Sequence, residues 1–137
     1  MGFPDLIPHL RDYLVTDVVS VPVFTFRPDP RPTAFVQLRR VGGTANDPVQ
    51  DQARVDLFTA APTDAEAMAL ALQVRTAVWA LPGTTRLSPV VVYRVAEFLG
   101  PRMDQDGDTA TPTVWATYDI TIRANSAIHL PPMEGSP

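Results

Sequence analysis

The chain has 137 residues, enough for one domain with a single hydrophobic core, and a formal net charge of −4. Its apolar fraction of 45% is that of a globular protein, and its charge gives no general attraction to nucleic acid or membrane surfaces. The absence of cysteine excludes disulfides, thiolate nucleophiles and zinc–thiolate sites, and we expect neither a signal peptide nor a membrane span.

The first third of the chain predicts a short helix followed by two strands. Asp5 can cap the helix, whose apolar residues share one face: Leu6, Leu10, Tyr13 and Leu14. Residues 21–26 alternate as a strand, and the prolines of 28–32 make a stiff connector. Residues 34–41 alternate again and predict a second strand.

A polar loop and a third strand precede the best-defined helix of the chain. Residues 42–52 read as a loop and 54–59 as a strand, so we expect a hairpin with a long connection. Thr63 and Glu66 have the spacing of a capping box, in which each side chain satisfies a backbone N–H. Leu81-Pro82-Gly83 is expected to end this helix.

This long helix carries two stripes at helical spacing. The first is expected to face the sheet and contains Ala67, Leu70, Ala71, Val74, Val78 and Leu81. The second contains Met68, Leu72, Arg75 and Trp79. Two interpretations stay open for it: cover by the first helix, or contact with another protein, whose interface core favours methionine, tryptophan and arginine. Both interpretations hold if the first helix covers only part of this second stripe.

The last third predicts two further strands, at 89–96 and 113–123, separated by a loop over 100–112. The second of them has the clearest alternation and belongs in the middle of a sheet. Together the elements predict an α+β domain over residues 1–124: a mostly antiparallel sheet of about five strands with two helices packed on one face. If the third and fourth strands are parallel neighbours, their crossover is right-handed. Residues 125–137 form a proline-rich tail without apolar periodicity.

The sequence offers little for catalysis or ligation. His9 and His129 lack nearby partners at metal-ligand or relay spacing, and no hydrolase, phosphate-binding or dinucleotide-binding motif is present. Residues 104–108 (DQDGD) alternate carboxylates as calcium loops do, but they lack the bidentate glutamate and flanking helices, which favours a solvated hairpin tip. We therefore expect no catalytic residues, no metal, no cofactor and no enzymatic activity.

Arg39 and Arg40, beside Gly42 and Gly43, form the one compact basic feature. Adjacent strand residues face opposite sides, so the two arginines are expected to point apart. They are either surface charges paired with Asp56 or Asp51, or contacts for an acidic partner or a DNA backbone.

The order of these parts resembles the tail terminator, or tail completion, proteins of long-tailed phages that infect actinobacteria. The resemblance rests on residues 35–43 (FVQLRRVGG), 51–58 (DQARVDLF) and 63–67 (TDAEA), the last opening an alanine-rich helix. Residues 92–95 (VYRV) and a final strand ending in TIR at 121–123 are similar to the family too.

The resemblance implies a structural virion protein at the tail–neck junction, made in the host cytoplasm. Such subunits form a hexameric ring on the tail tube, end its polymerisation and present the surface that joins the head. Partners would be the tail tube protein and a head–tail connector or stopper protein, with DNA passing non-specifically through the lumen and no membrane contact. A head-completion or stopper protein is the alternative, followed by a small hydrolase or ligand-binding domain. The interface candidates are Arg39, Arg40, Gly42, Gly43, Met68, Leu72, Arg75 and Trp79.

Overall fold

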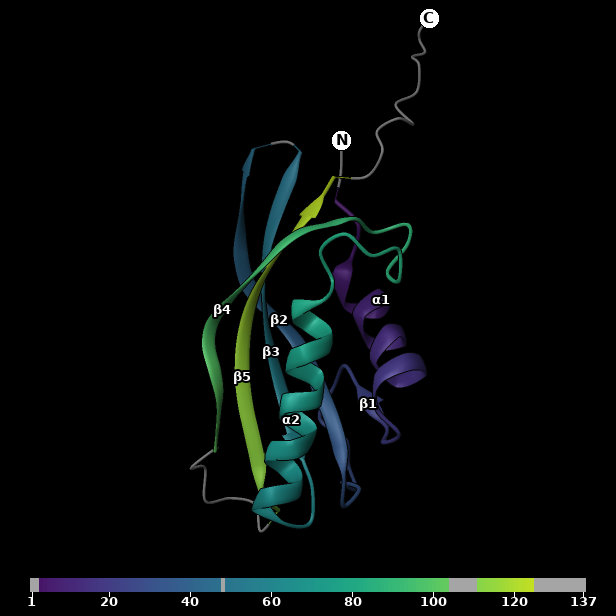
Figure 1. The fold of residues 1–137 in the computed structure, drawn as a ribbon, viewed down its shortest axis with the longest axis vertical. Coiled ribbons are helices and arrows are strands. Elements are labelled where there is room, and N and C mark those ends of the chain that lie inside the picture. The colour runs from purple at the N-terminus through teal and green to yellow at the C-terminus, as the bar shows by residue number, and fades with distance from the viewer. Residues whose placement is uncertain (1–2, 48, 104–110, 125–137) are drawn as a thin grey trace, which may run out of the picture.

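A computed structural model describes residues 3–47, 49–103 and 111–124, and Figure 1 shows their fold. A five-stranded sheet has the order β1-β2-β3-β5-β4, with both helices on one of its faces. The predicted α+β class is confirmed. The elements in chain order are α1 (Leu6–Tyr13), the π-helical turn η1 (Leu14–Val18), β1 (Val23–Phe24), β2 (Phe35–Asp47), β3 (Gln50–Ala60), α2 (Asp64–Trp79), β4 (Val92–Met103) and β5 (Thr113–Arg123).

The strand with the clearest alternation, β5, lies inside the sheet as predicted. It pairs antiparallel with β3 on one side and with β4 on the other. The strands joined by α2 are therefore separated by β5 and are not neighbours, so the condition set for a right-handed crossover between neighbours is not met. Of the strand pairs in the described residues, only β1 and β2 are parallel.

The predicted loop over residues 42–52 is wrong, because β2 continues to Asp47 and β3 begins at Gln50. The register shifts between Arg40 and Gly43, and Gly42 and Gly43 adopt φ angles of 115° and 110°. These angles lie in the region open to glycine, so the pair bends β2 without ending it. Thr44 and Ala45, the described side chains just beyond the bend, are both exposed, so this part of β2 lacks the apolar alternation that marks a strand.

Other strand boundaries also differ from expectation. β1 covers only two residues because the chain bends at Thr25, ahead of the proline-rich connector. β4 begins at Val92 and runs through Gly100 to Met103, since an edge strand tolerates Pro101. The calcium-like segment 104–108 and the tail 125–137 lie outside the described residues.

Both helices begin where the sequence predicts. The Asp5 side chain accepts a hydrogen bond from the Ile7 N–H at 3.3 Å. Thr63 Oγ1 accepts a hydrogen bond from the Glu66 N–H at 3.1 Å, as the capping box predicts. The Glu66 carboxylate differs from the prediction, because Oε1 accepts from the Thr63 hydroxyl at 2.9 Å and not from the Thr63 N–H. The helix ends at Trp79, two residues before Leu81, which is itself buried.

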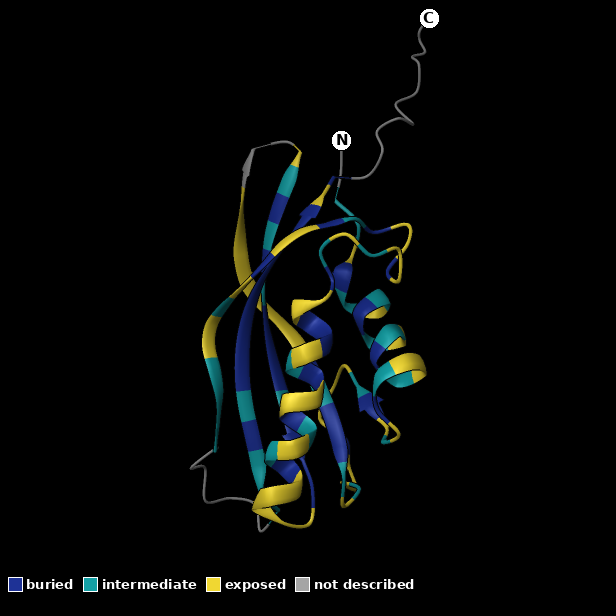
Figure 2. Cartoon of the chain, in the orientation of Figure 1, coloured by how far each residue is buried: buried dark blue, intermediate teal, exposed yellow. Residues whose placement is uncertain are grey.

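The main core lies between the sheet and the helices, as the burial colours of Figure 2 show. α1 and η1 contribute Leu6, Leu10 and Leu14, each no more than 1% exposed. Four members of the first stripe of α2 are buried: Ala67, Ala71, Val74 and Val78. Tyr118 of β5 is among the largest fully buried side chains, and its hydroxyl has no hydrogen-bond partner among the described residues.

Tyr118→Phe tests whether this hydroxyl contributes to stability. Removing an unpaired buried hydroxyl should leave the free energy of unfolding at about pH 7 unchanged or higher. Burial, helped by the nearby Glu97 carboxylate, raises the Tyr118 pKa to about 12. An unfolded phenol ionises at about pH 10, so the wild type should lose stability between these values, and the variant should lose less.

Urea denaturation at neutral and alkaline pH measures both effects, with Tyr93→Phe as the control because that ring is exposed. A loss of stability in Tyr118→Phe at neutral pH that Tyr93→Phe does not show would mean that the hydroxyl has a partner.

Candidate interaction surfaces

The sheet has one face that neither α1 nor α2 covers, which we call the open face. Strand alternation places it opposite the core residues of β3 and β5, and cross-strand register brings its central residues together in pairs. These pairs are Arg54 with Asp119, Asp56 with Thr117, and Phe58 with Trp115.

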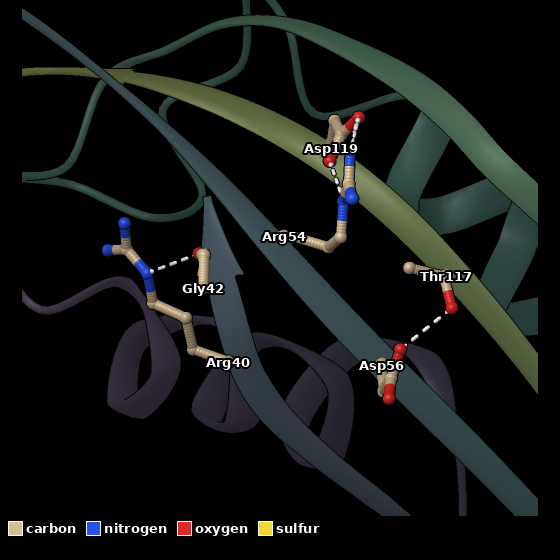
Figure 3. A network of polar contacts seen from close by, with 6 residues as sticks. All are labelled: Arg40, Gly42, Arg54, Asp56, Thr117 and Asp119. Atoms are coloured by element: carbon tan, nitrogen blue, oxygen red, sulfur yellow. Dashed lines mark hydrogen bonds and ion pairs between the residues drawn. The ribbon is translucent and has the colours of Figure 1, made fainter. Parts of the chain in front are cut away.

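Two carboxylates on the open face are buried, and each has partners. Arg54 donates from Nε to Asp119 Oδ1 at 2.9 Å and from Nη2 to Oδ2 at 3.3 Å (Figure 3). These hydrogen bonds raise the Arg54 pKa. Asp56 Oδ1 accepts from Thr117 Oγ1 at 2.7 Å, and its Oδ2 lies 3.8 Å from Arg39 Nη2. Pairing offsets the cost of removing these carboxylates from water.

Three arginines of the open face lie over aromatic rings. The guanidinium carbon of Arg54 is 3.8 Å from the Phe98 ring centroid, and that of Arg102 is 4.1 Å from the Trp115 centroid. Arg39 lies 5.4 Å from the Phe58 centroid, and Phe58 stacks on Trp115 with 5.6 Å between centroids. We call these residues the arginine–aromatic layer: Arg39, Arg54, Arg102, Phe58, Phe98 and Trp115.

This layer shields the polar centre of the sheet and holds guanidinium planes near the surface. Thr117 and Thr121 are only 3% and 2% exposed although no helix lies over them. Stacked guanidinium groups lose less conformational freedom on binding than mobile ones, and they retain donors for carboxylates or phosphates. The open face therefore presents stacked guanidinium groups, the kind of donor that suits carboxylates or phosphates.

The open face is also basic, although the whole chain is acidic. The sheet register places Arg94 beside Thr121 and Arg123 beside Gln50 on this face, and both arginines are exposed. Together with the layer they make five arginines against two carboxylates, Asp56 and Asp119, among the side chains that the structure describes on this face; the chain as a whole has a net charge of −4.

A second surface lies on α2, on the side of the molecule opposite the open face. Leu72 and Trp79 are 43% and 47% exposed, so the first helix does not cover the second stripe at these positions. Figure 2 shows the outward side of α2 exposed along its length. Met68 instead packs against a small buried cluster, and Arg75 makes hydrogen bonds of 2.8 and 3.0 Å to Glu97.

The corner from Arg39 to Gly43 separates its two arginines, as predicted. Arg39 belongs to the open face, whereas Arg40 binds both Asp51 oxygens at 2.7 Å and the Gly42 carbonyl at 2.9 Å. The Asp51 hydrogen bonds raise the Arg40 pKa. The expected pairing with Asp56 and Asp51 is confirmed. Arg40 thus braces the hairpin.

Two findings bear on other kinds of function. Among residues 3–47, 49–103 and 111–124, no three metal-ligating side chains gather closely enough to hold an ion. Neither helix in the described part of the chain has the length and apolar character needed to cross a membrane.

Sequence reasoning missed most of the open face. The sequence analysis named Arg39 but not Arg54, Phe58, Trp115 or Asp119. Trp115 and Asp119 alternate with the apolar residues of the strand predicted at 113–123, which has the clearest pattern in the chain. The signal that could have found this face is the presence of opposite charges and aromatic rings at the outward-facing positions of the strands predicted at 54–59 and 113–123, since such side chains pair across neighbouring strands.

Comparison with known proteins gives no family for the chain. No model of a known protein family matches the sequence, and no curated protein matches it.

Gly43→Ala should destabilise the fold more than Gly42→Ala. Both residues have positive φ, which costs an alanine about 1–2 kcal/mol. A Cβ on Gly43 would also collide with the Gln52 carbonyl oxygen and the Arg54 backbone nitrogen, whereas a Cβ on Gly42 meets nothing within 4 Å. Thermal denaturation of the two variants measures the difference. Equal losses would mean that the hairpin yields freely at Gly43.

Thr117→Val should cost about 1–3 kcal/mol of unfolding free energy, because it deprives the buried Asp56 carboxylate of its shortest hydrogen bond. Thr121→Val is the matched control: it is equally buried on the same strand face, and the described residues give its side chain no hydrogen bond. Urea denaturation compares them. Equal effects of the two substitutions would show that the Asp56 contact carries no net stability.

Proposed function

We propose that this chain is a structural subunit of a phage tail, a tail terminator that forms a ring on the tail tube and ends its polymerisation. The ring would then present the surface that the head connector or stopper protein binds, and DNA would pass through its lumen. The proposal starts from the resemblance of residues 35–43, 51–58 and 63–67 to that family.

The arrangement of those segments supports the proposal. They correspond to β2, β3 and the start of α2, which are consecutive in the chain and packed on one another. A single small domain with a sheet covered on one side is a suitable building block, because its remaining surfaces are free for neighbours.

The observation that carries the proposal is the presence of two chemically different exposed surfaces on opposite sides of the molecule. A closed ring of identical subunits uses heterologous contacts, in which one surface of each subunit meets a different surface of the next. The open face is basic and aromatic, whereas the outward side of α2 is apolar around Leu72 and Trp79.

Capping of tail tubes tests the function. Purified tube protein is polymerised with increasing amounts of this chain, and tube length and end labelling are measured by electron microscopy. We expect shorter tubes with the chain at one end only. Normal tube length with no end labelling at every ratio would contradict the proposal. Parallel binding to isolated tails and filled heads separates a terminator from a head-completion or stopper protein.

Trp79→Glu gives a sharper form of this test. Trp79 is half-exposed, so the charge should leave the fold intact while removing capping activity. Phe26→Glu is the control, since Phe26 is an exposed aromatic residue away from α2, at 61% against 47% for Trp79. Unfolding of Trp79→Glu, as measured by circular dichroism, would show that Trp79 contributes to the stability of the core and not to an interface. Capping at the wild-type level would exclude it from the interface.

A further inference from the structure

We propose that the outward side of α2 in one copy of this chain packs on the open face of the next copy. The inference rests on the proposed ring and names the two surfaces that meet in it. It joins the two surfaces described above, and it explains why each carries apolar groups that are exposed in the described part of the chain.

The charges of the two surfaces are complementary. Arg94, Arg102 and Arg123 on the open face have no ion pair within the described part of the chain. The first turn of α2 exposes Asp64 and Glu66. The only arginine on α2 is Arg75, and Glu97 of its own chain already neutralises it. Bringing the start of α2 onto the open face therefore places negative charges beside arginines that have no ion pair among the described residues.

The apolar groups of the two surfaces also match. Phe98 and Leu99 on β4 are 51% and 43% exposed, much like Leu72 and Trp79 on α2. Cores of protein interfaces are enriched in aromatic residues and arginine, which is the composition of the arginine–aromatic layer. On the N-terminal side of Leu72, α2 exposes the small residues Ala65 and Ala69, so its backbone can approach a neighbouring sheet closely there.

The placement of the surfaces makes the contact directional. The sheet lies between them, so one copy cannot satisfy both sides of the contact, and a pair of copies leaves one surface of each kind unused. Repetition then gives a ring or a filament. Contact between two open faces would set five arginines against five, which like-charge repulsion opposes.

A nucleic acid is the other occupant that a basic face suggests, and the observations favour it less. The Arg39 and Arg54 guanidinium groups are already held by Asp56 and Asp119. The chain as a whole is negatively charged, so long-range repulsion opposes approach to a polyanion.

The absence of cysteine allows a direct test by engineered crosslinking. Ala69→Cys labels the outward side of α2 and Ala96→Cys labels the open face beside Asp119, and both alanines are exposed. A short bismaleimide is added to each variant alone, to their mixture and to the double variant, with and without tube protein polymers. We expect a heterodimer from the mixture and a ladder from the double variant that stops at the ring size.

Ser20→Cys, which lies on an exposed turn after η1, replaces either label as the control for random collision. Crosslinking no greater than this control, with and without tubes, overturns the inference. So does Ala69→Cys that crosslinks to itself as well as to Ala96→Cys, because that indicates a two-fold contact.

Two additional readouts separate the competing outcomes. Capping of tubes without crosslinking of the cysteine pair would support the proposed function and contradict this choice of surfaces. A crosslinked ladder without capping would support the choice of surfaces and contradict the proposed function. Binding to a fluorescent DNA duplex is measured with Arg94→Glu/Arg102→Glu beside the wild type. Tight duplex binding that this double substitution abolishes, while crosslinking is unchanged, assigns the open face to nucleic acid and overturns the inference.

Discussion

The structure depends on one constraint: in the described part of the chain, two helices cover only one face of a five-stranded sheet, so the strands shield the other face with their own side chains. The central strands β3 and β5 place buried carboxylates on that uncovered face, at Asp56 and Asp119. An unpaired buried charge is costly, so each carboxylate needs a neighbour that supplies donors and excludes water. Cross-strand register supplies those neighbours.

The arginine–aromatic layer meets both needs with few residues. Arg39 and Arg54 pair with the carboxylates, and all three arginines of the layer lie over aromatic rings with their planar guanidinium groups. The layer is still partly exposed, since Phe98 is more than half accessible. The same groups that close the sheet therefore form a partly exposed surface, and in the proposed assembly one set of residues would serve both stability and association.

The sequence predicted those parts of the fold that depend on local chemistry. The Thr63 cap and the stripe of Ala67 and Val74 placed α2, and strict alternation placed β5 inside the sheet. The extension of β2 past Gly43 was not predicted, because Thr44 and Ala45 are both exposed and show no apolar alternation. The open face was missed for a different reason. Arg54 and Asp119 are 65 residues apart, and their contact follows from strand order, which one sequence does not reveal.

The central claim is that α2 and the open face become buried together when copies of the chain associate. The two tryptophans report on this directly, since Trp79 lies on α2 and Trp115 on the open face. Trp115→Phe leaves Trp79 as the only tryptophan, and Trp79→Phe leaves only Trp115. Acrylamide quenching of each variant, measured in dilute solution and in the assembly, therefore reports on one surface at a time. The account predicts that both tryptophans are less accessible in the assembly. Either tryptophan remaining as accessible in the assembly as in the dilute chain would contradict it.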